Sequence, residues 1–303
     1  MRKTLISIVG PTAIGKTSLS IEIAKAFETE IISCDSRQFY KEMSIGTAVP
    51  SKEELNEVKH HFIQNISIFE IYSVGKFEKE AIELIENKFK KYDILCLTGG
   101  SGLYQKAVLE GLDDFPKVNP EIRKKLNKRY NNNGIEDLQK QLKRLDPEYF
   151  KAVDTQNPHR LIRALEICLG TGKPFSYYLK QRKNYKRDFN SIKIGLTAGR
   201  EIIYERIEKR VELMFDNGLL EEAKSLFKHK HLNALKTVGY KEIFDFIEGN
   251  ISLEQAKSEI KKNTRRYAKR QLTWYRKEAD IRWFQFDCDR NQIVEYINQN
   301  LPK

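Results

Sequence analysis

Cysteine is scarce in this chain of 303 residues, and the four that occur, Cys34, Cys96, Cys168 and Cys288, lie far apart. No C-x-x-C pair is present and no histidine stands at ligand spacing from a cysteine, which argues against a disulfide framework and a zinc site. No apolar run approaches the ~18 residues that a membrane-spanning helix needs. The apolar stretch near the start is also too short for a secretory signal peptide. We therefore expect a cytoplasmic protein without a membrane partner.

Acidic residues are outnumbered by basic ones. The chain has 54 Lys and Arg against 42 Asp and Glu, a net charge of +12. This surplus favours a polyanionic partner such as a nucleic acid. A lysine-rich surface without a partner explains the same number, so the distribution of the charge along the chain has to decide.

Short apolar runs that alternate with helix-like segments indicate the fold class. The runs predict buried strands at residues 4–9, at 30–35, within 92–104 and at 191–198. Between two of these runs, residues 73–92 place Phe77, Ala81 and Ile85 at steps of four, as on one face of a helix. The alternation predicts an α/β fold, a mostly parallel sheet with helices on both faces.

Two stretches lack the strand pattern. Residues 113–190 are charged, helix-prone and interrupted by NNNG, DP and TGKP, so we expect an all-helical insertion domain there. The core domain then consists of residues 1–112 and 191–303. Within it, residues 200–286 are predicted to be helical.

The sequence GPTAIGKT follows the first predicted strand and precedes an amphipathic segment. It fits the pattern G-x-x-x-x-G-K-[ST] of a phosphate-binding loop in the strand–loop–helix context that the pattern requires. The predicted phosphate-binding residues are Gly10, Pro11, Thr12, Ala13, Ile14, Gly15, Lys16 and Thr17. Backbone N–H groups would surround a phosphate, Lys16 would neutralise it, and the Thr17 hydroxyl would reach Mg²⁺. A nucleoside triphosphate such as ATP is the usual occupant, and a glycine-rich turn without a ligand is the structural alternative.

A carboxylate is expected beside this loop. Asp35 follows the second predicted strand, and ligands of parallel sheets bind beyond the carboxyl ends of the strands. The third run ends in Thr98, Gly99 and Gly100 rather than in the aspartate that organises Mg²⁺ in many ATPases. These features favour a simple diphosphate over a nucleotide, with Asp35 as a general base on a neighbouring nucleophile. The structural alternative for Asp35 is the N-cap of a helix.

The C-terminal third carries a local positive charge. Between Ala256 and Trp283, ten Lys or Arg residues stand against three Asp or Glu residues. Five of the basic residues recur at steps of three and four: Lys262, Arg265, Arg266, Lys269 and Arg270. On a helix they cover one face, roughly opposite three residues of a predicted core face: Ile260, Tyr267 and Trp274. Such a face suits the phosphate backbone of RNA, while a solvated surface helix is the alternative.

Seven blocks extend the pattern beyond the loop. They are GPTAIGKT, DSRQFYKEMSIGTA, GGSGLY, NPHRLIRALEI, RVELMFDNGLLEE, VGYKE and KRQLTWYR, and they span residues 10–276. In order and spacing they resemble those of the tRNA dimethylallyltransferases, also called tRNA isopentenyltransferases. The resemblance implies a fold like that of phosphate-loop kinases. It also implies transfer of a dimethylallyl group from dimethylallyl diphosphate to the N6 amine of the adenosine 3′ to the tRNA anticodon, with Mg²⁺.

By this resemblance the loop holds the diphosphate of an isoprenoid. The implied catalytic residues are Asp35, Thr12, Lys16 and Arg210, and Thr17 is the implied metal ligand. Thr12 and Arg210 would contact the diphosphate near the breaking bond, and Asp35 would accept a hydrogen from the amine. The implied contacts to the anticodon stem-loop, besides the five basic residues above, are Asp35, Ser36, Arg37, Gln38, Ser101, Arg123, His159, Arg160, Leu161, Ile162 and Arg163. We expect a monomer that binds one tRNA.

Some positions depart from the family pattern. Ser101 stands where Thr is common, Gln64 where Asp is usual and His159 where Gln is usual. Three alternatives stay open. An adenylate isopentenyltransferase would prenylate a free nucleotide and needs no basic helix face, whereas a small-molecule kinase would bind ATP in the loop and use Asp35 on a hydroxyl. An RNA-binding protein would carry the loop as a relict.

Overall fold

The computed structural model describes residues 3–113, 115–181 and 186–302. They form two compact units. The first consists of Met1–Glu110 and Arg187–Lys303, and the second of Gly111–Lys186.

The second unit ends at Lys186, before the expected boundary at residue 190. The physical reason is Arg187, which donates to Glu78 Oε1 at 2.7 Å and to the carbonyl oxygen of Ala107 at 2.6 Å. Both partners belong to the first unit, so the chain is already fixed to that unit before its next strand begins.

A six-stranded parallel sheet forms the centre of the described part of the first unit, with strand order β3-β2-β4-β1-β5-β6. The strands are β1 (Thr4–Val9), β2 (Ile31–Ser33), β3 (His60–His61), β4 (Ile94–Thr98), β5 (Asn190–Thr197) and β6 (Ile281–Gln285). Every residue of β1 and β4 is buried. Strands covered on both faces are expected as continuous apolar runs, which is why the sequence predicted these two correctly.

The prediction that residues 200–286 are helical is wrong at β6. This strand pairs in parallel with β5 at the edge of the sheet, with Gly195 opposite Trp283. Its five residues, IRWFQ, include Arg282 and Gln285, both exposed. A short, half-polar edge strand lacks the apolar run on which the prediction depended.

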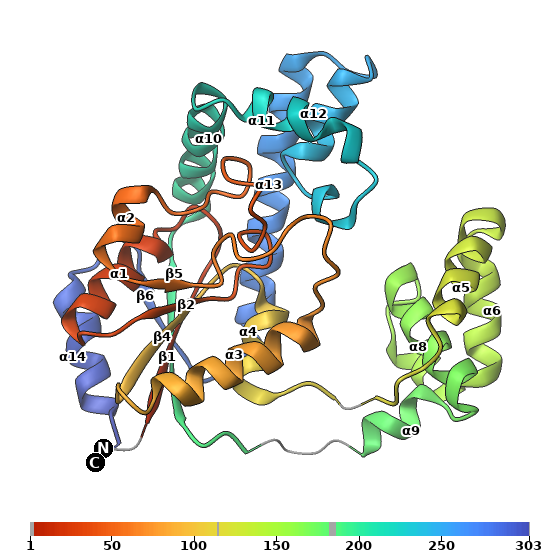
Figure 1. Ribbon diagram of the computed structural model, residues 1–303, viewed down its shortest axis with the longest axis horizontal. Coiled ribbons are helices and arrows are strands. Elements are labelled where there is room, and N and C mark those ends of the chain that lie inside the picture. The colour runs from red at the N-terminus through yellow and green to blue at the C-terminus, as the bar shows by residue number, and fades with distance from the viewer. Residues whose placement is uncertain (1–2, 114, 182–185, 303) are drawn as a thin grey trace. The chain divides into compact units, whose positions relative to one another are not determined.

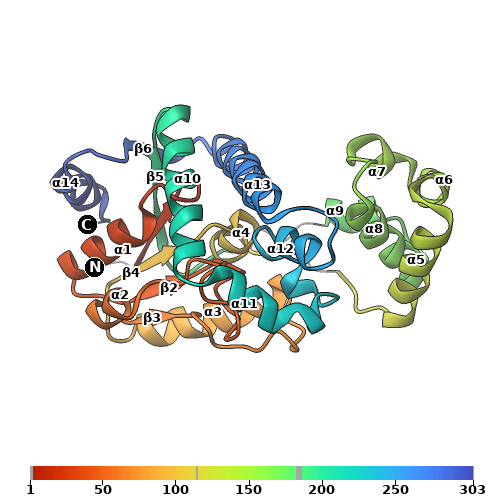
Figure 2. The same cartoon turned by 90° about the horizontal axis from the view of Figure 1, so that it is seen from above.

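Helices cover both faces of the sheet (Figures 1 and 2). The helices of the described first unit are α1 (Lys16–Ala26), α2 (Lys52–Glu57), α3 (Val74–Lys88), α4 (Gly102–Glu110), α10 (Arg200–Asp216), α11 (Leu219–Leu226), α12 (Tyr240–Ile247), α13 (Leu253–Tyr275) and α14 (Arg290–Asn300), with 3₁₀ turns at Phe227–His229 and Asn233–Leu235. α1 and α14 lie on one face, and α3 and α4 lie on the other. The predicted α/β class, with a mostly parallel sheet and helices on both faces, is confirmed.

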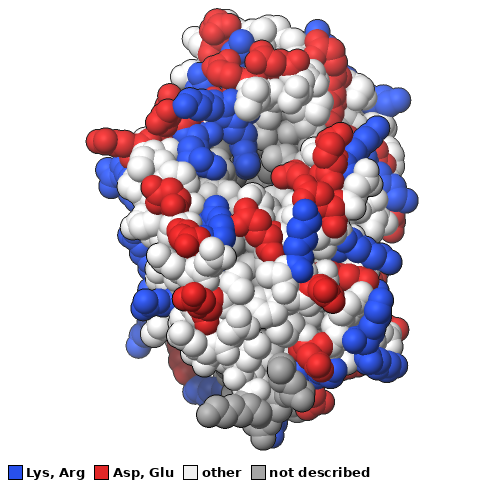
Figure 3. All heavy atoms as spheres, turned by 90° about the vertical axis from the view of Figure 1, so that its left-hand side faces the viewer, with Lys and Arg blue, Asp and Glu red and all other residues white. Residues whose placement is uncertain are grey.

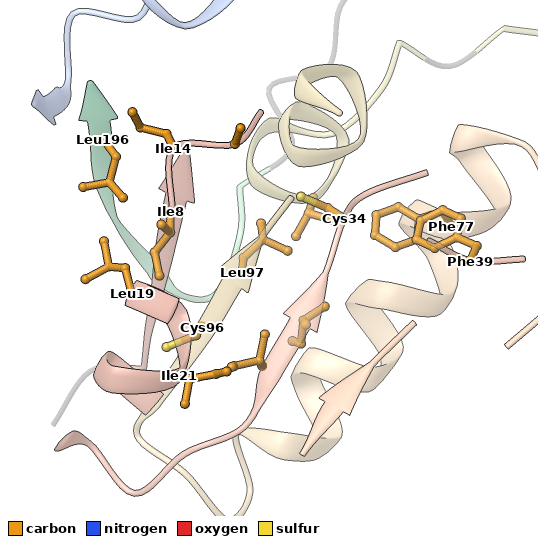
Figure 4. Packing of buried hydrophobic residues seen from close by; sticks show 14 of the residues in the cluster. Ile8, Ile14, Leu19, Ile21, Cys34, Phe39, Phe77, Cys96, Leu97 and Leu196 are labelled. Carbon is orange, nitrogen blue, oxygen red and sulfur yellow. The ribbon is translucent and has the colours of Figure 1, made fainter. Parts of the chain in front are cut away.

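The core of the first unit is continuous through the sheet (Figure 4). Leu19 and Ile21 of α1 pack from one side, and Phe77 of α3 packs from the other. Phe77 stacks on Phe39 with ring centroids 5.2 Å apart, and Phe39 lies just after the strand-end residue Asp35. The residues that follow β2 are therefore anchored in the core on the side where a ligand would bind.

The second unit contains helices and no strand among its described residues. They are α5 (Pro120–Asn133), α6 (Ile135–Leu145), α7 (Pro147–Ala152), α8 (Pro158–Thr171) and α9 (Phe175–Lys180). Asn119, Asp146 and Asn157 each cap a helix whose first turn begins with proline. This is the expected role of proline at a helix start. The unit has its own core, centred on Leu126, Leu138, Leu142, Leu161 and Leu165.

None of the helices among residues 3–113, 115–181 and 186–302 has the length and apolar character required to cross a membrane.

Candidate active site

The phosphate-loop sequence connects β1 to α1 with an unusual backbone. Gly10 and Gly15 have φ of +146° and +105°, and Ala13 has φ of +65°. A Cβ on Gly10 would lie 2.6 Å from the carbonyl oxygen of Leu196, so only glycine fits there. A non-glycine residue at positive φ stores strain of the kind found at ligand-binding sites.

Lys16 is folded back over this loop. Its Nζ donates to the carbonyl oxygens of Gly10 at 3.1 Å and Pro11 at 2.8 Å. Burial lowers the pKa of Lys16 to about 8, against the opposing effect of the Asp35 charge. The loop therefore holds a partly desolvated cation that a diphosphate would stabilise.

Two arginines of α10 reach the same loop. Arg210 Nη1 donates to Thr12 Oγ1 at 3.3 Å, and Arg206 Nε donates to the carbonyl oxygen of Ala13 at 2.7 Å. Burial, with the neighbouring Arg206 charge, lowers the pKa of Arg210. The sequence identified Arg210 only through the resemblance, because one arginine of a surface-like helix carries no signal of its own.

Asp35 stands at the carboxyl end of β2. Its Oδ1 accepts from the backbone N–H of Arg37, and its Oδ2 accepts from that of Gly100, both at 3.1 Å. Residues 36–39 form a turn and not a helix, so Asp35 is not a helix N-cap. A Cβ on Gly100 would lie 2.8 Å from Asp35 Oδ2, which explains why glycine follows β4 at this point.

Ser101 joins the two strand ends. Its Oγ accepts from the backbone N–H of Ser36 at 3.0 Å and lies 2.9 Å from Ser36 Oγ. Gln38 Nε2 donates to the carbonyl oxygen of Ala48 at 2.7 Å, and Arg37 donates to that of Ala234 at 3.2 Å. The segment from Asp35 to Gln38 is thus fixed by partners from distant parts of the first unit.

One cavity of about 990 Å³ in the first unit collects most of the predicted site residues. The predicted residues that line it are Thr12, Ala13, Ile14, Gly15, Lys16, Thr17, Asp35, Ser36, Arg37, Gln38, Ser101, Arg210 and Arg270. The phosphate loop and the carboxylate therefore line one space, as their positions at strand ends suggested. A cavity of this size accommodates a small-molecule ligand.

Two residues that hold the cavity wall were missed by the sequence analysis. Gln271 of α13 is 5% exposed and bonds to both Thr12 and Gly100. Glu222 of α11 accepts from three successive backbone N–H groups, those of residues 44–46, each at 2.9 Å, and from the Tyr240 hydroxyl at 2.6 Å. Both lie inside family-like blocks, but a polar residue on a helix gives no sign that it is buried.

The predicted basic face of α13 is only partly free. Arg265 Nη1 lies 2.8 Å from Glu208 Oε1 and its guanidinium covers the Tyr204 ring, while Lys262 pairs with Glu259. The other three, Arg266, Lys269 and Arg270, are exposed.

The predicted core face of α13 needs correction. Ile260 is buried, but Trp274 is 37% exposed and lines the cavity with Tyr267. The buried positions are Ala256, Ile260, Ala268, Gln271 and Tyr275. The helix is rotated relative to the predicted orientation, because Ala268, Gln271 and Tyr275 face the interior with Ile260, whereas Trp274 does not.

Net charge is not gathered in one patch on the face of the molecule that Figure 3 shows. Lys and Arg side chains there are interspersed with Asp and Glu. The surplus of +12 thus does not by itself mark a nucleic-acid surface on this face.

The second unit holds the remaining predicted contacts. Arg123 and Arg163 both donate to Glu166 Oε2, at 2.8 and 3.1 Å, and their side chains remain about half exposed. His159 and Arg160 are exposed at the start of α8.

The side chains of Leu161 and Ile162, which are also predicted to contact tRNA, are buried. They are 0% and 4% exposed and belong to the core of the second unit. The resemblance implies contacts from every residue of the segment 159–163. In a helix, however, successive residues lie on different faces, and some of these faces are buried.

The fold and the cavity define a class: an α/β protein in which a phosphate-loop sequence and a strand-end carboxylate line the same space. A family model described as IPP transferase matches residues 38–278. The chain belongs to the IPP transferase family, and the family predicted from the sequence blocks is confirmed. It is a prenyltransferase by this membership.

The similarity to relatives and to solved structures extends over nearly the whole chain. The chain is 61% identical to a tRNA dimethylallyltransferase of Christiangramia forsetii, over 99% of each chain. It resembles the structure of a full-length tRNA isopentenylpyrophosphate transferase from Bacillus halodurans with TM-score 0.72 and 38% identity, covering 99% of this chain and 95% of that one. A eukaryotic dimethylallyltransferase acting on tRNA gives TM-score 0.82 and 26% identity, covering 98% and 79%.

Proposed function

We propose that this protein transfers the dimethylallyl group of dimethylallyl diphosphate to the N6 amine of the adenosine 3′-adjacent to the anticodon of tRNA. The observation that carries the proposal is the shared cavity, in which Lys16 of the phosphate loop and Asp35 line the same space. In the reaction the bond between the allylic carbon and the diphosphate oxygen breaks. A bond from N6 to that carbon forms, and the amine loses one proton.

The phosphate loop serves the leaving group. The allylic carbon releases diphosphate readily because the developing cation is delocalised, so catalysis depends mainly on stabilising the departing oxygens. Lys16 and the loop N–H groups supply positive charge on one side, and Arg210, which contacts Thr12, supplies it on another. The lowered pKa of Lys16 favours this role, since a buried ammonium gains most from an anion beside it.

Asp35 serves the acceptor. The adenine amine is a weak nucleophile because its lone pair is shared with the ring, and a carboxylate that accepts its hydrogen strengthens it. The hydrogen bonds from Arg37 and Gly100 hold the Asp35 carboxylate in place. The adenosine has to leave the anticodon-loop stack for its amine to reach this carboxylate.

At this site Mg²⁺ would be held mainly by oxygens of the diphosphate and less by protein groups. The described residues contain no group of three or more His, Cys, Asp or Glu side chains that could hold a metal. Thr17 lines the cavity at the end of the loop, and its hydroxyl is the protein ligand we propose. Mg²⁺ commonly binds through one or two protein groups with phosphate oxygens and water, and it would neutralise the leaving diphosphate.

The proposal that tRNA is the partner rests on the names of the relatives and on exposed cations. Arg266, Lys269 and Arg270 on α13, and Arg123 and Arg163 in the second unit, are accessible to a phosphate backbone. An adenylate acceptor would need none of them. Acting on tRNA, the enzyme would work in the cytoplasm, one monomer on one tRNA.

The test is incubation of the protein with Mg²⁺, unmodified tRNA and dimethylallyl diphosphate, followed by mass analysis of the nucleosides. A companion reaction replaces tRNA with AMP, and another replaces the isoprenoid with ATP. We expect a gain of one dimethylallyl group on a single adenosine of tRNA, and none in the ATP reaction. Prenylated AMP without prenylated tRNA, or ATP consumption alone, would contradict the proposal.

A further inference from the structure

A buried glutamine bridges the two walls of the cavity. Gln271 Oε1 accepts from the backbone N–H of Thr12 at 2.8 Å, and Gln271 Nε2 donates to the carbonyl oxygen of Gly100 at 2.8 Å. The residue is 5% exposed and lies on α13. One planar amide thus connects the phosphate loop to the turn that follows β4.

The far end of this bridge reaches the carboxylate. Gly100 donates its own N–H to Asp35 Oδ2 at 3.1 Å, and its carbonyl oxygen accepts a second bond from the Tyr267 hydroxyl at 2.9 Å. The contact is tight, because a Cβ on Gly100 would lie 2.8 Å from both Asp35 Oδ2 and Gln271 Nε2. A continuous path of hydrogen bonds therefore runs from Thr12 through Gln271 and Gly100 to Asp35.

We propose that Gln271 is a positioning residue that sets the separation between the phosphate loop and the Asp35 carboxylate. This inference rests on the proposed function. The leaving diphosphate lies on one side of the allylic carbon and the amine held by Asp35 lies on the other. Gln271 contacts the protein backbone on both sides and needs no contact with the reacting atoms.

The separation of the two walls determines whether the allylic carbon forms its new bond to N6 or to the oxygen of water. Its bond to the diphosphate oxygen breaks as positive charge develops, and the N6 lone pair must be near enough to form the new bond. If the walls separate, water fills the gap and its oxygen bonds to the carbon, with one proton released to solvent. The products are then dimethylallyl alcohol and diphosphate, and no adenosine is modified.

Two substitutions remove different parts of the bridge. Gln271→Glu keeps an acceptor for the Thr12 N–H but loses the donor to Gly100. Gln271→Leu loses both bonds at similar volume. Gly100→Ala disturbs the same junction from the opposite side. Gln255→Leu makes the same change at an exposed position of α13, where it removes the capping bond that Gln255 Oε1 accepts from the Ser252 N–H, and so controls for a loss of helix stability alone.

The experiment measures diphosphate released and N6-prenylated adenosine formed in one reaction, together with KM for each substrate. Wild type and Gln255→Leu should give a ratio near one. For Gln271→Leu we expect kcat to fall about tenfold to a hundredfold, because misplacement by about 1 Å costs up to about that much. Its ratio of diphosphate to modified adenosine should rise above one, while both KM values change less than about threefold. Gln271→Glu and Gly100→Ala should shift the ratio in the same direction.

The outcomes separate this inference from the proposed function. If wild-type protein modifies no adenosine, the proposed function fails. If wild type is active and the Gln271 variants keep its rate within twofold, the positioning role is wrong. A lower rate with the ratio still at one also overturns it, since loss of folded enzyme lowers both products together.

Discussion

The two walls of the cavity are built in opposite ways. The phosphate-loop wall comes from one contiguous stretch, residues 10–17, whose shape is set by glycines at positive φ and by a lysine that bonds within the loop. The acceptor wall is assembled from Asp35, which follows β2, and Gly100, which follows β4, and Gln271 of α13 connects this wall to the loop. The loop wall is thus encoded by a local sequence motif, whereas the acceptor wall exists only in the folded chain.

The two walls also differ in function: one binds the leaving diphosphate and the other positions the acceptor. The loop wall presents backbone N–H groups and a cation, which suit a diphosphate of many compounds. The acceptor wall places a carboxylate through a network of specific hydrogen bonds, which suits one acceptor. Substitutions on the loop wall should therefore reduce both the binding of the diphosphate and its stabilisation as a leaving group, and those on the acceptor wall should reduce only the rate of transfer.

The largest effect is expected on the acceptor wall, from Asp35→Asn. The amide keeps the size of the side chain but cannot accept a proton from the adenine amine. Because a general base contributes about 10²–10⁴ in rate, we expect kcat to fall about a thousandfold. Affinity for tRNA should stay within about tenfold, since removing one hydrogen bond costs roughly 1–2 kcal/mol. Single-turnover transfer and filter binding measure the two quantities separately.

Asp35→Ala should abolish turnover with the same small effect on tRNA binding. If affinity collapsed together with the rate, Asp35 would be a structural residue of the wall. Retention of the wild-type rate by Asp35→Asn would remove it from the role of base.

On the loop wall, Lys16→Ala should weaken the binding of inorganic diphosphate about a hundredfold. The buried ammonium lies against the loop that is predicted to hold the anion, and loss of one member of a buried charge pair costs about 2–5 kcal/mol. Titration calorimetry measures this affinity without any acceptor present. The rate at saturating substrate should change less than it does in the Asp35 variant.

The pH dependence sharpens this prediction. Burial lowers the pKa of Lys16 to about 8, so the lysine is charged below this pH and neutral above it. Only the charged form attracts diphosphate, and affinity should fall by up to about tenfold per pH unit above pH 8. Lys16→Arg stays charged over this range and should show no such fall. An equal decline in both proteins would assign the titration to another group.

The same contrast explains what the sequence could predict. The loop and Asp35 follow apolar strands, so strand-end geometry was enough to place them together. Gln271 was missed because its burial depends on the rotation of α13, which brings Ala268 and Tyr275 rather than Trp274 to the interior. The burial of Leu161 was likewise not predicted, since a short motif does not say which side of its helix is buried.

A smaller effect is expected from Glu222→Gln, which tests whether the part of the cavity wall at residues 44–46 needs support from α11. The carboxylate accepts three backbone N–H groups and the Tyr240 hydroxyl. A neutral amide is the weaker acceptor, and its NH₂ group would oppose these donors. We expect about 1–3 kcal/mol of lost stability and faster hydrogen exchange at residues 44–46. Glu221→Gln, an exposed neighbour on the same helix, is the control and should change neither.

The smallest effect is expected at α13, which carries both cations that are paired within the protein and cations that are accessible to solvent. Arg265 is tied to Glu208 and the Tyr204 ring, whereas Arg266 and Lys269 are exposed. Removing both exposed cations, as Arg266→Ala with Lys269→Ala, should lower the slope of log affinity against log salt by about 0.7–0.9 for each RNA phosphate that is no longer neutralised. Arg265→Ala should change the slope less and stability more, because its charge is already paired within the protein. Equal slopes for wild type and the double variant would place the tRNA backbone elsewhere, and the basic pattern of this helix would then be that of a solvated surface.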